Sequence, residues 1–221
     1  MLKLLVASIG KRLGFRERRV SLFMEAVRPT SEEMILDLGC GDGAYFVLSF
    51  PHKAKVIGVD VKWERLRDMR RRFPQTRAVV ADGRKLPFKD KGVDIIFSNS
   101  TIEHLGDFEA QKLFAQEIMR VGGRCFIQTP NRYFPIEPHT FVPLFQFLPR
   151  GLQRFLSLRL PLGHYARGGV LRDAVSLLSG KDLLRLFPGS KIYRERFLGL
   201  TKSFCVYSNG SEKQEIIDWK D

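Results

Sequence analysis

The chain has 221 residues, 44% apolar and 28% charged, with a formal net charge of +13, a balance typical of one basic globular domain. No run of about 18 uncharged apolar residues occurs, which excludes a membrane-spanning helix from the expectations. Cys40, Cys125 and Cys205 are far apart and lack C-x-x-C spacing, so they favour neither a disulfide framework nor a zinc site. We therefore expect a cytoplasmic protein.

The N-terminal segment is strongly basic. Residues 1–30 carry seven Lys or Arg and two Glu, and residues 1–28 are predicted to form one or two basic amphipathic helices. A basic surface can serve nucleic acid, anionic lipid or an anionic substrate, so charge alone does not choose the partner.

Short β-rich runs then alternate with helical patterns, which predicts βαβ units and a mainly parallel sheet. Five strands, each buried on both faces, are expected at 34–40, 56–60, 78–82, 93–98 and 124–129. Apolar stripes at helical spacing over 63–73 and 108–121 are expected to pack on the sheet. Residues 191–197 and 202–207, separated by a turn at Gly199, predict a closing antiparallel hairpin.

These elements predict an α/β fold with a Rossmann-like doubly wound sheet, mostly parallel, a C-terminal antiparallel hairpin and a lid insertion. We expect one domain over 1–221. It comprises basic N-terminal helices (1–30), a cofactor-binding core (31–131), a substrate lid insertion rich in Pro, Phe, Leu and Arg (132–178), and a closing helix and hairpin (179–210).

A glycine-rich turn follows the first strand. The pattern Asp37-x-Gly39-x-Gly41-x-Gly43 lies where open α/β sheets bind ligands, and Asp60, at the end of the second strand, suits a ribose diol. The same glycines also satisfy the dinucleotide form G-x-G-x-x-G/A, so the pattern alone leaves a nicotinamide cofactor open.

Acidic residues favour a different cofactor. Asp42 lies inside the turn and, with Asp37, Asp60 and Asp82, is expected to make this edge of the sheet negative. A pyrophosphate would be repelled there, at about 1 to 4 kcal/mol for each close like-charge contact. A sulfonium compound with an ammonium group would be attracted.

The joint motifs carry a family resemblance. They are Ile35-Leu-Asp-Leu-Gly-Cys-Gly-Asp-Gly43, Gly58-Val-Asp60, Ala81-Asp82-Gly83 with Leu86-Pro87-Phe88, Phe97-Ser98-Asn99 with Ile102-Glu103-His104, and Gly122-Gly123. In this order, over about residues 34–131, the chain resembles the class I S-adenosylmethionine-dependent methyltransferases, specifically the small-molecule branch that includes ubiquinone-pathway enzymes (type 11). The resemblance implies a seven-stranded sheet whose last strand is antiparallel.

The resemblance also implies which residues bind S-adenosylmethionine. Asp37 would orient the amino-acid portion, which Gly39 and Gly41 would contact. Asp60 would bind both ribose hydroxyls, Asp82 and the Gly83 backbone would face adenine, and Ser98 would lie near the methionine part. The implied cofactor-binding set is Asp37, Gly39, Cys40, Gly41, Asp60, Val61, Asp82, Gly83 and Ser98.

Two histidines are candidate catalytic residues. His104 follows the fourth strand where family members carry a histidine, and it could act as a base or face the acceptor; the alternative is a structural role. Glu103 is less favoured, and His139 is the second candidate base. The two histidines lack metal-ligand spacing, so no metal is expected.

A second cluster follows the fifth strand. Residues 129–139 resemble a P-N-R-x-F-P-x-E-x-H signature of methyltransferases that act on glycans, lipid-linked precursors or related small acceptors. The predicted substrate-binding residues are Asn131, Arg132, Tyr133 and Glu137. The alternative is a proline-stiffened loop whose polar residues cap the strand.

The segment after this cluster has two interpretations. Residues 141–172 carry five Arg and no acid, and a helix around 150–160 is apolar on one side. It could pack on the domain as a lid, which we favour, or lie on an anionic membrane surface.

We therefore expect transfer of a methyl group from S-adenosylmethionine to a small-molecule or lipid- or glycan-linked acceptor at oxygen. A nucleic-acid methyltransferase lacks support because Ser98-Asn99-Ser100-Thr101 replaces the D/N-P-P-Y/F motif of the amino-group enzymes. A noncatalytic partner or membrane-surface protein and a nicotinamide oxidoreductase are the remaining alternatives.

Overall fold

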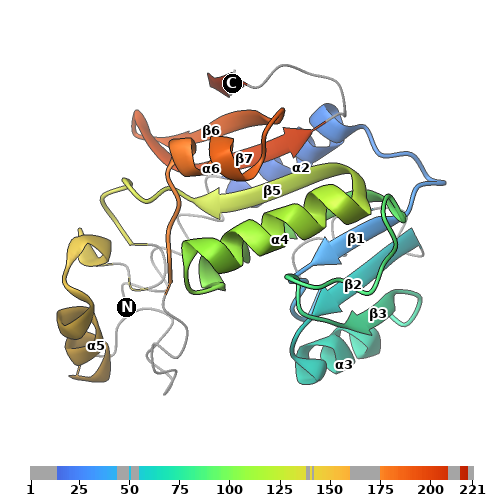
Figure 1. Ribbon diagram of the computed structural model, residues 1–221, viewed down its shortest axis with the longest axis horizontal. Helices are drawn as coiled ribbons and strands as arrows, with labels where there is room; N and C mark the ends of the chain where they lie inside the picture. Colours follow the sequence, from blue (N-terminus) through green and yellow to red (C-terminus); the bar gives the residue numbers. More distant parts are fainter. Residues whose placement is uncertain are drawn as a thin grey trace.

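The computed structural model describes residues 14–43, 50, 55–137, 140, 142–159, 175–208 and 215–218. Its centre is one eight-stranded sheet with the strand order β3-β2-β1-β4-β5-β7-β6-β8 (Figure 1). The strands are β1 (Ile35–Leu38), β2 (Val56–Asp60), β3 (Arg77–Val80), β4 (Val93–Asn99), β5 (Gly122–Pro130), β6 (Lys191–Phe197), β7 (Leu200–Ser208) and β8 (Glu215–Asp218).

The sheet is mixed, as the sequence predicts. Strands β1 to β5 pair in parallel, whereas β7 runs antiparallel to both β5 and β6. The short β8 pairs in parallel with β6 and extends the expected seven strands by one, so the antiparallel strand is not the last. The Rossmann-like α/β fold with its antiparallel hairpin is confirmed.

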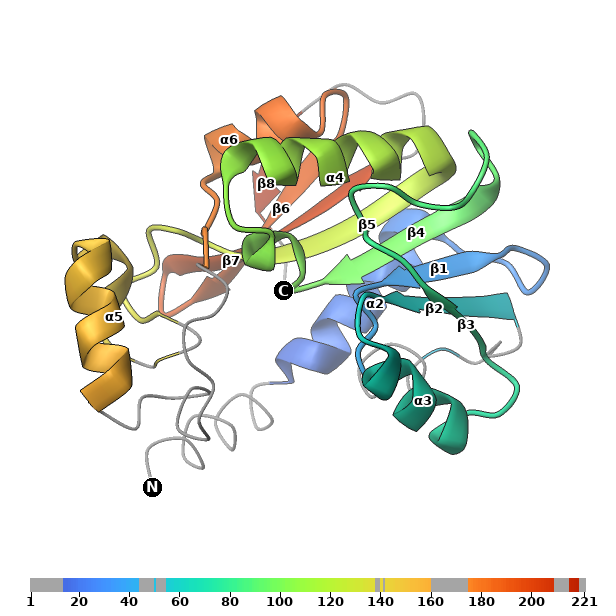
Figure 2. The ribbon, with the colours of Figure 1, turned by 60° about the horizontal axis from the view of Figure 1, so that its bottom comes forward.

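Helices cover both faces of the sheet (Figure 2). One face carries α2 (Phe15–Val27) and α3 (Trp63–Arg72), and the other carries α4 (Phe108–Val121) and α6 (Gly180–Leu186). Side-chain caps begin two of them: Asp107 accepts from the N–H of Ala110 in α4, and Ser179 forms a capping box with Asp182 in α6.

Each face has its own apolar core. On the α2 and α3 side, Phe23 of α2 meets Phe97 of β4 and Phe126 of β5 edge to face, at 5.4 and 5.6 Å between ring centroids. On the other side, Phe114 of α4 lies in a cluster with residues such as Ile127 of β5. Alternation along the parallel strands supplies both clusters, because successive side chains point to opposite faces.

Two sequence-based predictions need correction. The third strand is an edge strand with exposed ends, not a strand buried on both faces, because β3 has only β2 beside it. At the N-terminus, α2 accounts for the second half of the predicted basic helical segment, and residues 1–13 lie outside the described residues.

The predicted insertion, residues 132–178, contains the single-turn helix η3 (Phe145–Phe147) and α5 (Arg150–Arg159). In both views α5 stands beside the sheet at the end towards which β1 and β5 point (Figures 1 and 2). An isolated bridge between Asn131 and Leu178 closes the base of the insertion. Within the described residues, every helix is too short or too polar to cross a bilayer.

Candidate cofactor and acceptor site

The turn after β1 is built from glycines in left-handed backbone conformations. Gly39, Gly41 and Gly43 have φ angles of 76°, 58° and 71°, which side chains rarely adopt. The N–H groups of Gly39 and Cys40 both donate to the carbonyl of Val59, at 2.7 and 3.1 Å, and so join the turn to β2. A Cβ added at Gly41 would meet no atom of the described residues within 4 Å, so among these residues bare backbone borders open space there.

Asp60 is brought to the same turn from the end of β2. Its side chain is 6% exposed, and Oδ2 accepts from the N–H of Gly41 at 3.1 Å, while Oδ1 accepts from the N–H of Lys62 at 2.8 Å. Each carboxylate oxygen can accept a second hydrogen bond, so the carboxylate can hold the turn and still accept from a diol.

Asp37, in β1 beside β2, is 4% exposed. Burial, and to a smaller extent the neighbouring charge of Asp60, together raise the pKa of its carboxyl group to about 8. In the empty protein this carboxyl therefore holds a proton at neutral pH, and a bound cation beside it would favour its ionised form.

This raised pKa predicts proton release on cofactor binding. At pH 7 the ammonium group of S-adenosylhomocysteine (SAH) should displace up to one proton from Asp37 per molecule bound, whereas at pH 9 it should displace none. Calorimetric titration in two buffers of different ionisation enthalpy measures that number. Asp37→Asn should abolish the pH-dependent release, and equal release in this variant would contradict the assignment.

The same shift affects stability. A carboxyl whose pKa is higher in the folded chain binds its proton more tightly there than in the unfolded chain. The empty protein therefore loses stability as pH rises from about 4, the unfolded pKa of an aspartate, towards 8. Asp37→Asn should raise the melting temperature of the empty protein at pH 9.

The other two acids of the predicted negative edge are paired. Arg72 lies 2.6 Å from Asp42, and Arg84 binds both carboxylate oxygens of Asp82, with its shorter contact at 2.5 Å. The hydrogen bonds from Arg84 also lower the pKa of Asp82. The negative charge is therefore smaller than the sequence predicts, and electrostatics alone discriminate less strongly against a pyrophosphate.

Three other predicted cofactor residues lie around the turn. Cys40 is buried on the α3 side, with its thiol against the carbonyl of Gly41, so only its backbone borders the turn. Val61 follows Asp60 and is 64% exposed. Gly83 follows β3, and a Cβ there would lie 2.5 Å from the ring of Phe114, so packing against α4 requires glycine.

Ser98 ties β4 to β1 and is buried. Its hydroxyl donates to the carbonyl of Leu38 at 2.8 Å, and the hydroxyl of Thr101 reaches the same carbonyl at 3.4 Å. Thr101 also lies so close to Gly39 that a Cβ at Gly39 would collide with its side chain. The sequence analysis missed Thr101, whose side chain leaves room only for glycine at position 39.

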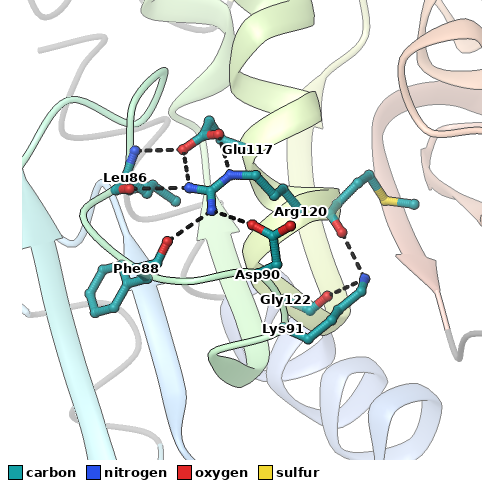
Figure 3. Close-up of polar contacts among 8 residues, drawn as sticks. Leu86, Phe88, Asp90, Lys91, Glu117, Arg120 and Gly122 are labelled. Carbon is teal, nitrogen blue, oxygen red and sulfur yellow. Dashed lines mark hydrogen bonds and ion pairs between the residues drawn. The ribbon is translucent and has the colours of Figure 1, made fainter.

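The loop after β3, which begins with the residues predicted to face adenine, is anchored to α4 (Figure 3). Arg120 donates to the carbonyls of Leu86 and Phe88, at 3.2 and 2.9 Å, and to Asp90 at 2.8 Å. Glu117 accepts from the N–H of Leu86 at 2.6 Å and pairs with Arg120. These contacts hold the loop in place.

The candidate catalytic residues differ in exposure. His104 is exposed at the end of the single-turn helix η2 (Ile102–His104), beyond the carboxyl end of β4. Glu103 is fully buried and accepts from the hydroxyl of Thr129 at 3.1 Å. His139 lies outside the described residues. Among the described residues, no group of three or more acids, histidines and cysteines could hold a metal ion.

The predicted substrate-binding residues differ in burial and in their contacts. Asn131 bridges β5 and β7, because its amide donates to the carbonyl of Thr201 at 2.7 Å. Glu137 is buried and accepts from the N–H of Thr140 at 2.6 Å, which organises the loop itself. Arg132 and Tyr133 are exposed. Asn131 and Glu137 thus make contacts of the kind that the alternative describes, and substrate binding by the four residues stays a prediction.

A polar cluster near the carboxyl edge of the sheet was not predicted. Arg19 of α2 forms an ion pair with Glu195 of β6 at 2.6 Å and donates to Asn99, at the end of β4, at 3.4 Å. Lys202 of β7 lies 3.4 Å from Glu195. Arg19 is far from Glu195 and Lys202 in the sequence, so the sequence did not indicate that they pair. The one available signal was that Glu195 and Lys202 are charged residues within predicted strands.

Part of the chain is similar to known methyltransferases. Residues 35–122 match a family model described as a methyltransferase domain. A probable S-adenosylmethionine-dependent methyltransferase of Mycobacterium tuberculosis is 32% identical over 141 residues, which cover 62% of this chain and 50% of that protein. The chain thus spans about half the length of this relative.

Two further proteins are similar over more of the chain. A ubiquinone biosynthesis O-methyltransferase of Coxiella burnetii is 28% identical over 171 residues, covering 73% of this chain and 69% of that protein. The crystal structure of magnesium protoporphyrin IX methyltransferase from Synechocystis, with bound SAH, has a TM-score of 0.58 at 13% identity and covers 89% of this chain and 83% of that chain. The latter shows a shared fold.

Proposed function

Because the chain carries a methyltransferase domain of the S-adenosylmethionine-dependent class, we propose that it methylates an oxygen atom of a small-molecule or lipid- or glycan-linked acceptor. The observation that carries this proposal is the open glycine turn at Gly41, whose N–H is bound by the carboxylate of Asp60. When bound, S-adenosylmethionine supplies the activated methyl group.

The residues present fit this cofactor. Gly41 leaves room for a ligand against bare backbone, and the carboxyl groups of Asp37 and Asp60 offer acceptors for an ammonium group and a ribose diol. The exposed Val61 supplies an apolar surface for an adenine ring next to Asp60. The Asp82–Gly83 segment lies close by, because the N–H of Ala81 donates to the carbonyl of Asp60 at 3.2 Å.

We assign the proton-accepting role to His104. An acceptor hydroxyl must lose its proton as the methyl group is transferred, and an exposed imidazole at neutral pH can take that proton. The backbone supports this assignment, because the N–H of His104 donates to the carbonyl of Thr101, whose hydroxyl in turn lies 3.4 Å from the carbonyl of Leu38 at the end of β1. Glu103 is fully buried and is the weaker candidate.

His104→Ala should leave SAH affinity unchanged and lower kcat about a hundredfold, as for loss of a general base. The assay is SAH formation from S-adenosylmethionine with an acceptor found in a screen of glycans, lipid precursors and phenols. Lys112→Ala, an exposed change on α4, is the matched control. Turnover of His104→Ala at the wild-type rate would exclude His104 as the base.

We further propose, in place of the lid interpretation that the sequence favours, that the protein binds its acceptor at an anionic membrane surface. Exposed apolar side chains gather on the insertion at Leu144, Phe147, Leu152 and Phe155, which are 42–55% exposed. On α5 they alternate with arginines such as Arg159, whose guanidinium lies over the ring of Phe155. An apolar helix side flanked by arginines suits the interface of an anionic bilayer.

A vesicle flotation assay tests this contact. The protein should float with vesicles containing phosphatidylglycerol at low salt and less at high salt, because salt screens the arginines. Leu152→Ser with Phe155→Ser should abolish flotation. Leu113→Ser, which changes a leucine on α4 that is more exposed than Leu152 (51% against 42%), should not. Absence of flotation at low salt would contradict the proposal.

The alternatives have less support. Nucleic-acid amino methylation would require a D/N-P-P-Y/F motif, but the chain has Ser98-Asn99-Ser100-Thr101 at the end of β4, and the buried Ser98 hydroxyl donates to the carbonyl of Leu38. A noncatalytic protein would have no need of an open turn beside two buried acids. A nicotinamide cofactor fits the glycines and Asp60 but not the family of the domain.

A further inference from the structure

A β-bulge changes the direction of one lysine in the closing hairpin. Glu195 on β6 pairs with Ser203 on β7, but the next residue, Arg196, pairs with Thr201. Lys202 is therefore the extra residue of the bulge and has no partner across the hairpin. Bulges of this kind re-aim side chains and are frequent beside active sites.

The bulge places Lys202 on the α2 side of the sheet. Phe204, two residues later, packs on the α4 side, and strict alternation would send Lys202 to the same side. Instead, its ammonium lies 3.4 Å from Glu195 and 3.6 Å from the ring centroid of Phe15 in α2. The lysine side chain keeps 28% of its surface exposed, so a ligand can reach it.

Glu195 already has strong partners besides Lys202. Arg19 donates to both carboxylate oxygens, at 2.8 and 2.6 Å, and the hydroxyl of Ser203 donates to one of them. Burial raises the pKa of Glu195, but Arg19 and Lys202 outweigh that effect and hold it at about 2. An ammonium group has three donors, and the described hydrogen bonds of Lys202 use one of them.

The cluster borders the carboxyl edge of the sheet on two sides. Arg19 donates to Asn99 at the end of β4, and the carbonyl of Lys202 accepts from the N–H of Asn131 at the end of β5. Ligands of open α/β sheets bind outside the carboxyl ends of such strands. Lys202 is partly buried, and its ammonium group has donors that the described hydrogen bonds do not use. It lies beside the carboxyl edge of the sheet, where we expect the acceptor to bind.

We propose that Lys202, aimed by the bulge and with Arg19 beside it, binds a carboxylate or phosphate group of the methyl acceptor. This inference rests on the proposed methyltransferase function and specifies its substrate class. Burial and Arg19 lower the pKa of Lys202, and an anion would reverse that effect. Glu195 and Arg19 position the lysine and set the local charge.

The test is an NMR titration of the SAH-saturated protein with inorganic phosphate and, separately, with acetate at constant ionic strength. The side-chain N–H of Arg19 and the amide of Ser203 report binding. We expect saturable shifts with at least one anion; the responding anion identifies a phosphate- or carboxylate-bearing acceptor. SAH affinity, measured in parallel, separates failure of this subsite from failure of the cofactor site.

Three variants sharpen the result. Lys202→Met should weaken anion binding about tenfold, as for loss of one charge-assisted hydrogen bond. Glu195→Gln should strengthen it, because an opposing charge is removed, and Lys202→Arg should preserve it. Lys112→Met, on α4, is the matched control and should have no effect.

No saturable response in a wild-type protein that binds SAH would overturn the inference. Equal anion affinity in wild type, Lys202→Met and Glu195→Gln would overturn it as well, since a lysine that only stabilises the hairpin would give that result. If Lys202→Met does not fold, the anion affinities of Lys202→Arg and Glu195→Gln still test the inference.

Discussion

Asp60→Ala is expected to weaken SAH binding about a thousandfold, since hydrogen bonds to a charged group contribute about 1.5 to 3 kcal/mol each and two ribose hydroxyls lose their acceptor. The loss has a second cause in this chain. The N–H groups of Gly41 and Lys62 also donate to Asp60, so the turn loses its anchor. Calorimetric titration with SAH measures the change.

Asp42→Ala is the matched control for this variant. Asp42 belongs to the same turn, but it is half exposed and paired with Arg72, and such surface pairs contribute about 0 to 1 kcal/mol. Its SAH affinity should stay within about fivefold of wild type. If the alanine variant does not fold, Asp60→Asn replaces it, because its amide oxygen can still accept a hydrogen bond from the turn. Equal losses in the Asp42 and Asp60 variants would contradict the assigned role.

Gly39→Ala and Gly41→Ala should separate folding from binding. Both glycines have positive φ, a strain of about 1 to 2 kcal/mol for alanine. At Gly39 the added methyl also collides with Thr101, and such overpacking adds about 1 to 3 kcal/mol. Gly39→Ala should therefore lower the free energy of unfolding by about 2 to 5 kcal/mol.

Gly41→Ala should leave a folded protein that no longer binds SAH well, because its methyl group enters the space next to Asp60 without touching any other atom of the described residues. Urea unfolding and SAH titration measure the two effects. Thr101→Ala should rescue part of the stability of Gly39→Ala. Wild-type SAH affinity in Gly41→Ala would show that the ligand does not lie against this turn.

Local signals explain which elements were predictable. The helix over Phe108–Val121 was predicted to the residue because an apolar stripe lies between the Asp107 cap and a glycine pair. The first hairpin strand, Lys191–Phe197, was also predicted to the residue. By contrast, β8 is only four residues long and forms against β6, and the exposure of β3 depends on its place at the edge of the sheet. Neither property is local in the sequence.

The same limit applies to the site. Asp60 and the glycine turn could be placed together because the carboxyl ends of neighbouring parallel strands share one edge. The pairing of Asp42 with Arg72 depends on how α3 lies beside the turn, so its effect on the local charge was not predictable. Lys202 is displaced by a bulge, and strand periodicity alone would place it on the wrong face.

The central claim is that the turn after β1 binds S-adenosylmethionine. Calorimetric titration of the purified protein with SAH, and separately with NADH, tests it most directly. The account predicts saturable binding of SAH with one site per chain and no saturable binding of NADH. Binding of NADH without SAH, or of neither compound, would contradict it.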